Sequence, residues 1–366
     1  MIPISKPYVG KLEKKFLFKE VNDGWISSRG GKIKEFEKKL AKFLKIKHVI
    51  TCSNGSAALI LALKALDIKK GDEVIVPDVS FGATINSVIN IGATPVISEI
   101  DKETWGFDIN KIKKRINKKT KAIIVVHLYG QPADMKKLLI IKKKYNLSII
   151  EDAAESFGSM INKKFTGTLG DIGCFSFFAN KTISTGEGGC CVTKNKRIAE
   201  KMILLKNHGM TDKKRYYHNV VGYNFRMTNL QAALGVGQLM NYKKFEKKRL
   251  FIEKFYNQAF KNEKGFLEQK ESKFTKRVCW LYTAKFNNTN LTKVRQFLSK
   301  YRIDSRRVFY PYHTMKVYKK YVPKNFDKKN SLELFHHGLS LPTFYEIKLD
   351  ELKLVVLNVK KFLKIN

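Results

Sequence analysis

The chain has 366 residues, enough to bury a large hydrophobic core and to form two domains in one subunit. Hydrophobic residues make up 43% of it and aromatic residues 12%, and this composition excludes an intrinsically disordered protein. The net charge of +39 raises the question of nucleic acid, but residues 51–100 and 151–200 nearly balance their basic and acidic side chains. The excess lies in lysine-rich helix faces such as residues 11–47, a pattern of solvated surfaces. We therefore expect no nucleic-acid partner, although the charge would attract an anionic small substrate.

The cysteines and the apolar pattern predict a cytoplasmic protein without membrane contact. The five cysteines are odd in number and lack Cys-x-x-Cys spacing, so we expect buried free thiols in a reducing compartment and no metal site. The first eight residues lack the apolar core of a signal peptide, and the sequence has no run of about 18 apolar residues.

The first two thirds of the chain alternate between strand-like and helix-like segments. A glycine-bearing loop over residues 22–31 precedes an amphipathic helix over 33–44, and a polar segment over 51–56 precedes a strongly helical stretch over 57–66. The predicted strands then cover residues 73–77, 95–99, 122–126, 147–151, 172–177 and 189–193, and helices near 84–91, 110–116, 134–145 and 197–205 fall between most of them. This alternation predicts an α/β domain whose mostly parallel sheet is covered on both faces.

The carboxy-terminal part predicts a smaller α+β unit. A long helical stretch over residues 227–260, with its cap expected at Thr228-Asn229-Leu230-Gln231, would lead into it. Strands are expected around 281–286 and 304–309, and helices at 291–301 and 350–363. We expect a large domain over residues 1–245 and a smaller one over 246–366.

Residues 170–189 contain the most informative lysine of this lysine-rich chain. A buried strand over 172–177 is followed by Asn180-Lys181-Thr182, and a glycine-rich turn over 186–189 leads into the next strand. Partial burial would lower the pKa of Lys181 and leave the free amine that Schiff-base chemistry needs. From this stretch alone, one more surface lysine is an equally good interpretation.

Four other segments place polar or aromatic side chains where such a sheet binds ligands. The segment Ser53-Asn54-Gly55-Ser56 fits either a phosphate cradle or an ordinary helix cap. Asp152 ends an apolar strand and fits either the partner of a protonated ring nitrogen or a capping carboxylate. His127 at a strand end and Phe81 in a loop could bind a ligand or belong to the core. The order of these segments along the chain is more specific than any one of them.

The ordered set resembles the DegT/DnrJ/EryC1/StrS family of pyridoxal-phosphate sugar aminotransferases. The resemblance extends from residues 25–28 to residues 310–313, and it is close in the runs 127–135, 175–183 and 222–229. These runs are most similar to the perosamine branch of the family. The resemblance implies an aspartate-aminotransferase-like (fold type I) architecture, with a large α/β domain and a smaller carboxy-terminal α+β domain. It also implies a homodimer whose active sites are shared at the interface.

The resemblance also implies roles for single residues. Lys181 would form the Schiff base with pyridoxal 5′-phosphate and later carry a proton between cofactor and substrate. Asp152 would keep the pyridine nitrogen protonated, and Phe81 would stack on the ring. Glu155 would lie near the cofactor hydroxyl, where many relatives have Gln or His. The phosphate would be held by Gly55, Ser56 and Ser176, and by Asn224 from the partner subunit.

For the reaction, the resemblance implies amino transfer from L-glutamate to a nucleotide-linked 4-keto-6-deoxy sugar, with GDP-4-keto-6-deoxy-D-mannose first among the substrates. A lysine at position 181 argues for amino transfer, because sugar 3-dehydrases of the family carry histidine there. A UDP- or dTDP-linked sugar, a 3-keto substrate, a dehydrase and a non-catalytic regulator stay open as alternatives. The pathway, whether lipopolysaccharide O-antigen, glycan or antibiotic supply, stays open as well.

Six residues in family-like loops and strand ends are candidate contacts of the nucleotide-sugar substrate. Arginine suits a pyrophosphate because its guanidinium donates two parallel hydrogen bonds. A surface or interface role fits these residues equally well. The candidates are Trp25, Arg29, His127, Arg226, Tyr312 and His313.

Overall fold

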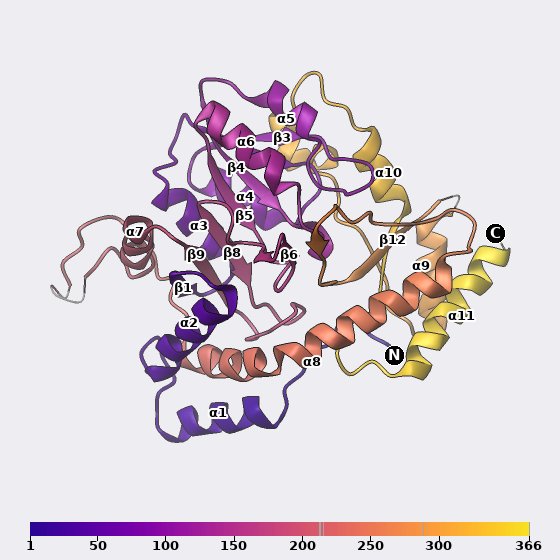
Figure 1. The fold of residues 1–366 in the computed structure, drawn as a ribbon, viewed down its shortest axis with the longest axis horizontal. Helices are drawn as coiled ribbons and strands as arrows, with labels where there is room; N and C mark the ends of the chain where they lie inside the picture. The colour runs from indigo at the N-terminus through magenta and orange to yellow at the C-terminus, as the bar shows by residue number, and fades with distance from the viewer. Residues whose placement is uncertain (212–213, 215, 288, 366) are drawn as a thin grey trace.

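A seven-stranded sheet forms the centre of the larger part of the molecule, in the order β1-β9-β8-β5-β4-β2-β3 (Figure 1). The computed structural model describes residues 1–211, 214, 216–287 and 289–365. Neighbouring strands from β3 to β8 are parallel, and β9 is antiparallel to both β8 and β1, which confirms the predicted mostly parallel sheet. The strands are β1 (His48–Cys52), β2 (Glu73–Pro77), β3 (Thr94–Ser98), β4 (Thr120–Val126), β5 (Ser148–Asp152), β8 (Ile172–Ser176) and β9 (Gly189–Thr193).

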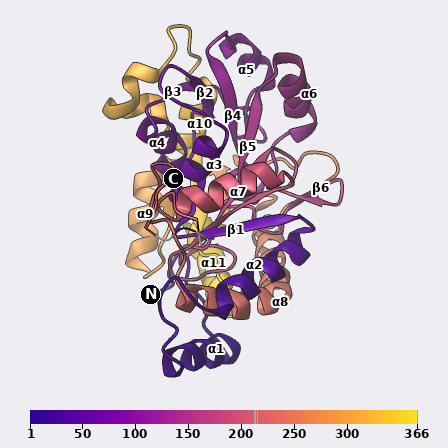
Figure 2. The same cartoon turned by 90° about the vertical axis from the view of Figure 1, so that its left-hand side faces the viewer.

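Helices cover both faces of this sheet because alternate residues of each strand point to opposite sides. In β4, Ile124 packs into the core formed with α3 and α4, whereas Ile123 and Val125 pack toward α5 and α6. Figure 2 shows these two helix pairs on opposite sides of the strands. The helices are α1 (Lys11–Asn22), α2 (Gly31–Leu44), α3 (Gly55–Ala65), α4 (Gly82–Asn90), α5 (Ile109–Arg115), α6 (Met135–Tyr145) and α7 (Lys196–Lys206).

The carboxy-terminal part contains a four-stranded antiparallel sheet in the order β10-β12-β14-β13, which packs on α9, α11 and the end of α8. The predicted strand over 304–309 shrinks to two residues, and β10, β14 and α10 were not predicted. The elements are β10 (Phe266–Glu268), β12 (Tyr282–Phe286), α9 (Leu291–Lys300), β13 (Arg306–Arg307), α10 (Lys329–His337), β14 (Gly338–Leu341) and α11 (Leu349–Ile365). A separate three-stranded sheet joins β6 (Met160–Ile161), β7 (Lys164–Phe165) and β11 (Thr275–Lys276).

Helix α8 (Asn229–Phe260) connects the two sheets and runs beneath both in Figure 1. Its predicted cap is confirmed, since the Thr228 side chain accepts the N–H of Gln231 and the Gln231 side chain accepts the N–H of Thr228. Val236 packs beneath the large sheet, whereas Tyr256 packs in the core of the small one. A division of the chain at residue 245 falls inside this helix, so the domain boundary stays a prediction.

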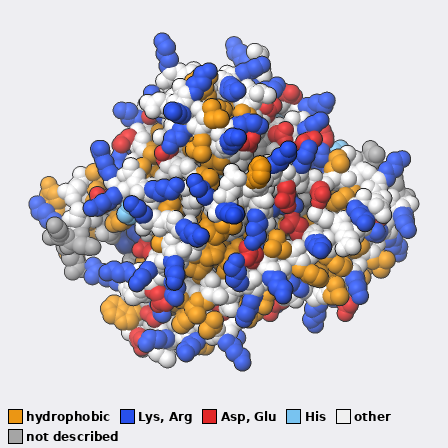
Figure 3. Space-filling view, viewed as in Figure 1, with side chains coloured by type: hydrophobic (Ala, Val, Ile, Leu, Met, Phe, Trp, Pro, Cys, Tyr) orange, Lys and Arg blue, Asp and Glu red, His pale blue; other side chains and the backbone are white. Residues whose placement is uncertain are grey.

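The surface and the thiols agree with the sequence pattern. On the face shown in Figure 3, Lys and Arg side chains are spread over many elements. All five cysteines are buried and free, as predicted. Within the described residues, every helix is too short or too polar to cross a bilayer.

Candidate active site

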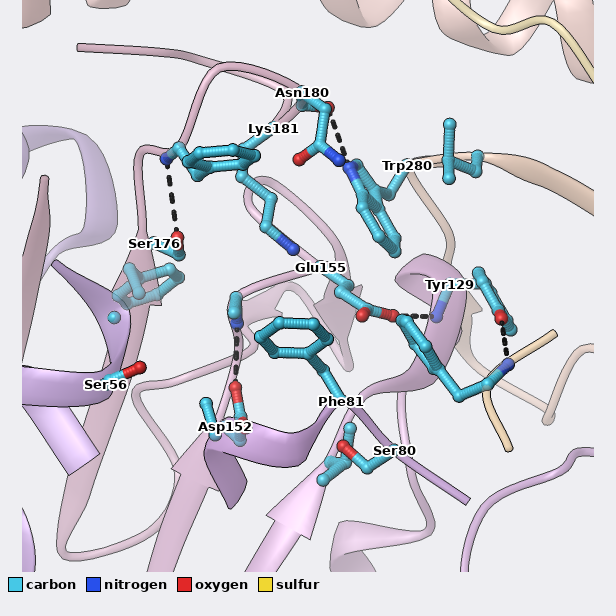
Figure 4. A pocket seen from close by; sticks show the side chains of 18 of the residues that line it. Ser56, Ser80, Phe81, Tyr129, Asp152, Glu155, Ser176, Asn180, Lys181 and Trp280 are labelled. Atoms are coloured by element: carbon cyan, nitrogen blue, oxygen red, sulfur yellow. Dashed lines mark hydrogen bonds between the residues drawn. The ribbon is translucent and has the colours of Figure 1, made fainter. Parts of the chain in front are cut away.

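A cavity of about 460 Å³ opens at the carboxyl ends of β5 and β8 and at the starts of α3 and α4 (Figure 4). In parallel sheets, the residues that follow the strands gather at one edge, where ligands bind. The small unit closes the opposite side of the cavity with Trp280, Arg306 and Phe309. The predicted cofactor residues in its lining are Gly55, Ser56, Phe81, Asp152, Glu155, Ser176 and Lys181.

Lys181 extends into this cavity from the loop that follows β8 (Figure 4). Its N–H donates to the carbonyl of Phe178 at 2.9 Å, and its Nζ lies 3.8 Å from the centre of the Trp280 ring. Burial lowers the pKa of Lys181, while the carboxylates of Glu155 and Asp152 oppose that shift and the Arg249 cation reinforces it. Burial therefore shifts Lys181 toward the neutral amine.

Asp152 is a buried carboxylate at the last position of β5. Its Oδ2 accepts the Thr84 hydroxyl at 2.8 Å, and its Oδ1 accepts the N–H of Ala154 at 3.2 Å. Neither partner carries a charge. Burial raises the pKa of Asp152. The Thr84 and Ala154 donors, together with the charges of Lys181 and His127, lower it but do not cancel the effect of burial. A cationic group in the cavity would compensate this carboxylate.

Glu155 lies between Lys181 and Tyr129 in Figure 4. Its Oε2 accepts the N–H of Tyr129 at 2.8 Å, and Tyr129 adopts a left-handed conformation with φ 54°. Burial raises the pKa of Glu155 to about 7, and Lys181 and the Tyr129 N–H counteract the shift. Glu155 can therefore gain or lose a proton near neutral pH, next to the lysine amine.

The start of α3 and the end of β8 together form a candidate anion site. The N-cap residue Asn54 accepts the N–H of Ala57 at 2.8 Å, which leaves the N–H groups of Gly55 and Ser56 at the first helical positions without an intrahelical carbonyl. A Cβ atom at Gly55 would lie 2.9 Å from the Cβ of Ser176. Glycine is therefore required for the close approach that brings the Ser176 hydroxyl beside these N–H groups.

Aromatic rings form the remaining walls. The Phe81 ring is 62% exposed and projects into the cavity between Asp152 and Glu155 (Figure 4). Tyr129, Trp280 and Phe309 form a cluster of nearly parallel rings, in which the Tyr129 centroid lies 5.9 Å from that of Trp280 and 5.6 Å from that of Phe309. The prediction missed Trp280 and Phe309, because both lie in short apolar stretches that read as core, and no local motif marks them.

Comparison with known proteins identifies the chain. The model of the DegT/DnrJ/EryC1/StrS aminotransferase family matches residues 8–360. The chain belongs to this family. It is 40% identical over 368 residues to GDP-perosamine synthase of Vibrio cholerae, with 99% of each chain covered. It is 38% identical over 363 residues to GDP-perosamine synthase of Escherichia coli O157:H7, with 99% of this chain and 98% of that one covered.

The solved structures agree with the family assignment. The putative sugar aminotransferase Spr1654 of Streptococcus pneumoniae, in its PLP form, superimposes with a TM-score of 0.92 and 26% identity. That match covers 100% of this chain and 99% of Spr1654. The predicted fold type I architecture and the predicted enzyme class, an aminotransferase, are both confirmed.

Three residues expected to contact substrate are enclosed in this aminotransferase, which corrects that expectation. The Nδ1 of His127 accepts the N–H of Ala133 at 3.1 Å, and its Nε2 donates to Glu151 at 2.9 Å, so the buried ring has no free nitrogen. Buried Tyr312 donates its hydroxyl to the carbonyl of Phe81 at 2.7 Å. His313 pairs with Asp78, with Nδ1 and Oδ2 2.6 Å apart. These side chains support the cavity wall from behind.

Four other expected residues lie on the surface, outside the cavity of their own chain. Trp25, Arg29 and Asn224 are exposed, and Arg226 donates from Nε to the Ser28 hydroxyl at 3.0 Å. The N–H of Asn229, at the start of α8, donates to the carbonyl of Ser27, so α8 holds the loop that carries Trp25 and Arg29. A role of these residues in a partner's site stays a prediction.

Proposed function

We propose that this aminotransferase converts GDP-4-keto-6-deoxy-D-mannose to GDP-perosamine, with L-glutamate as the amino donor. The observation that carries the proposal is the meeting of the Lys181 amine and the Asp152 carboxylate in one cavity of a chain that matches a GDP-perosamine synthase end to end. Relatives with that name support a GDP-linked sugar over a UDP- or dTDP-linked one.

Pyridoxal 5′-phosphate is the cofactor in this proposal, because four features of the cavity fit it. The N–H groups of Gly55 and Ser56, with the Ser176 hydroxyl, suit its phosphate. Asp152 is a buried carboxyl group whose two hydrogen-bond donors are both uncharged, which suits a protonated ring nitrogen. The exposed Phe81 ring offers a stacking surface, and the lowered pKa of Lys181 suits covalent attachment. When bound, the cofactor supplies an electron sink for amino transfer.

The protein's own groups handle the proton. A neutral Lys181 amine would accept a proton from one of the two carbons that flank the transferred nitrogen and would release it to the other. Glu155, with a pKa of about 7, stabilises the lysine in its protonated form and so balances the two states. Trp280 and Phe309 exclude water from the side of the cavity that faces the amine.

The proposal extends to the assembly. Asn224, Arg226, Trp25 and Arg29 would act in the site of a second copy, as part of a homodimer that works in the cytoplasm. Their position outside the cavity of their own chain supports the shared site, and the buried free thiols support a reducing compartment.

A panel of nucleotide sugars tests the substrate. The purified protein is incubated with L-glutamate and with GDP-, UDP- or dTDP-linked 4-keto-6-deoxy sugars, and amino-sugar product is measured by mass. We expect turnover of the GDP-linked mannose derivative. Turnover of only a non-GDP sugar would refute the substrate assignment, and ammonia release without glutamate would indicate a dehydrase.

A further inference from the structure

The strongest observation that the proposed reaction leaves unexplained is a buried arginine on α8. Arg249 is 5% exposed. Its Nη1 donates to the carbonyl of Cys279 at 3.2 Å and to the carbonyl of Trp280, and its Nη2 lies 3.5 Å from the carbonyl of Lys181. None of these partners carries a charge. Burying a cation on backbone carbonyls alone is costly, so the arrangement calls for a reason.

Another buried arginine provides the contrast. Arg277 forms an ion pair with Glu253 and lies 3.8 Å from Glu271, so its charge is compensated. The pKa values of the two arginines shift in opposite directions. Burial lowers the pKa of Arg249 to about 10, whereas carboxylates raise the pKa of Arg277 despite burial. No carboxylate accounts for the burial of Arg249, so we look for its role in the backbone groups that it contacts. These groups lie next to the Lys181 amine.

Those contacts form a closed set around Lys181. Arg249 holds the backbone of Trp280 and approaches the backbone of Lys181, while the Trp280 indole N–H donates to the carbonyl of Asn180 at 2.8 Å. The Trp280 ring in turn lies 3.8 Å from the Lys181 Nζ. One guanidinium thus ties together α8, the loop after β8 and the segment before β12.

We propose that Arg249 is a positioning residue, which fixes the Lys181 backbone against the Trp280 wall so that the amine points into the cavity. The inference rests on the proposed role of Lys181. The charged groups that face Lys181 are Glu155, Asp152 and Arg249, and Tyr242 and Cys279 face Arg249. Among these, Arg249 adds to the lowering of the Lys181 pKa, so the same contact also favours the neutral amine.

The test measures covalent attachment of pyridoxal 5′-phosphate to the cofactor-free protein as a function of pH, in Arg249→Met, Arg249→Lys and the control Arg277→Met. For Arg249→Met we expect attachment slower by about tenfold or more, because the amine is misplaced, and a midpoint shifted to higher pH. Arg249→Lys should restore the midpoint, since the charge remains, but only part of the rate, since the fork of donors is lost. Arg277→Met should lower the thermal stability without moving the midpoint.

Each outcome decides the matter. Attachment by Arg249→Met at the wild-type rate and with the wild-type pH midpoint would overturn the proposal. If Arg249→Met does not fold, a wild-type rate in Arg249→Lys would overturn it equally. A wild-type protein that never attaches the cofactor would instead refute the proposed function, before any variant is compared.

Discussion

At the scale of single residues, burial drives three ionisable groups that line the cavity, Lys181, Asp152 and Glu155, toward their neutral forms. It lowers the pKa of Lys181 and raises the pKa values of Asp152 and Glu155. A ligand with a cationic ring nitrogen would offset the cost of burying the carboxylates of Asp152 and Glu155. Binding of such a ligand would explain why Lys181, Asp152 and Glu155 share one cavity.

Replacing Glu155 by Gln should flatten the pH dependence of stability of the cofactor-free protein. The pKa of about 7 in the folded protein lies above the ordinary 4.5, so the native state binds an extra proton between these values. The stability from that proton is present below about pH 4.5 and is lost as the pH rises through 7. Between about pH 4.5 and pH 7, we expect the free energy of unfolding of wild type to fall by up to roughly 3 kcal/mol relative to that of Glu155→Gln.

Urea unfolding at a series of pH values measures this difference. The exposed cavity residue Glu187 provides the control, because Glu187→Gln removes the same charge without removing a buried carboxyl group. Parallel stability curves for wild type and Glu155→Gln would contradict the account of Glu155.

At the scale of elements, the cavity depends on how closely the start of α3 approaches the end of β8. Gly55→Ala places a Cβ 2.9 Å from the Cβ of Ser176, so the strand end must shift away from the helix start. We expect the affinity for pyridoxal 5′-phosphate to fall by about tenfold, a loss of roughly 1.4 kcal/mol. A fluorescence titration of the cofactor-free protein measures it.

Gly31 is the matched control for this change. It is also the first residue of a helix, α2, and a Cβ there meets nothing within 4 Å. Gly31→Ala should therefore leave the affinity for the cofactor unchanged. Equal affinities of Gly55→Ala and wild type would show that the helix start does not hold the phosphate.

The elements also show what the sequence can and cannot predict. Lys181 follows an apolar strand, Asp152 ends one, and Ser56 lies at the start of a helix, so periodicity places them at one edge of the sheet. Trp280 and Arg249 come from the carboxy-terminal third and from mid-helix, and only tertiary packing brings them to Lys181. The two-residue strand β13 is too short for any periodic pattern, and β14 follows α10 directly, with no loop between them.

The sequence also does not show which groups form hydrogen bonds with a buried side chain. His127 looks like a ligand residue because it ends a strand, but Glu151, the Ala133 N–H and close packing occupy its ring. A pattern of polar residues predicts that a residue lies at a strand end. Whether its side chain points into the cavity or into the core depends on neighbours that are distant along the chain.

At the scale of the whole molecule, the shared-site proposal predicts complementation between two defective subunits. Lys181→Ala and Asn224→Ala should each be nearly inactive alone. When coexpressed, half of the dimers are mixed, and each mixed dimer regains one intact site, so activity should recover to about a quarter of wild type.

Coexpression of Lys181→Ala with Asp152→Asn provides the control. One chain supplies both residues to its own cavity, so each site of a mixed dimer carries one of the two defects. We expect no recovery from this pair. Failure of the Lys181→Ala and Asn224→Ala pair to recover would place Asn224 outside the partner's site.

The most direct test of the central claim, that Lys181 carries cofactor-dependent amino transfer, is the absorbance spectrum of the purified protein. Wild type loaded with pyridoxal 5′-phosphate should show a visible band that moves to shorter wavelength when L-glutamate is added, and Lys181→Ala should lack that covalently attached species. A wild-type protein that stays colourless after incubation with the cofactor, or an unaltered spectrum in Lys181→Ala, would contradict the account.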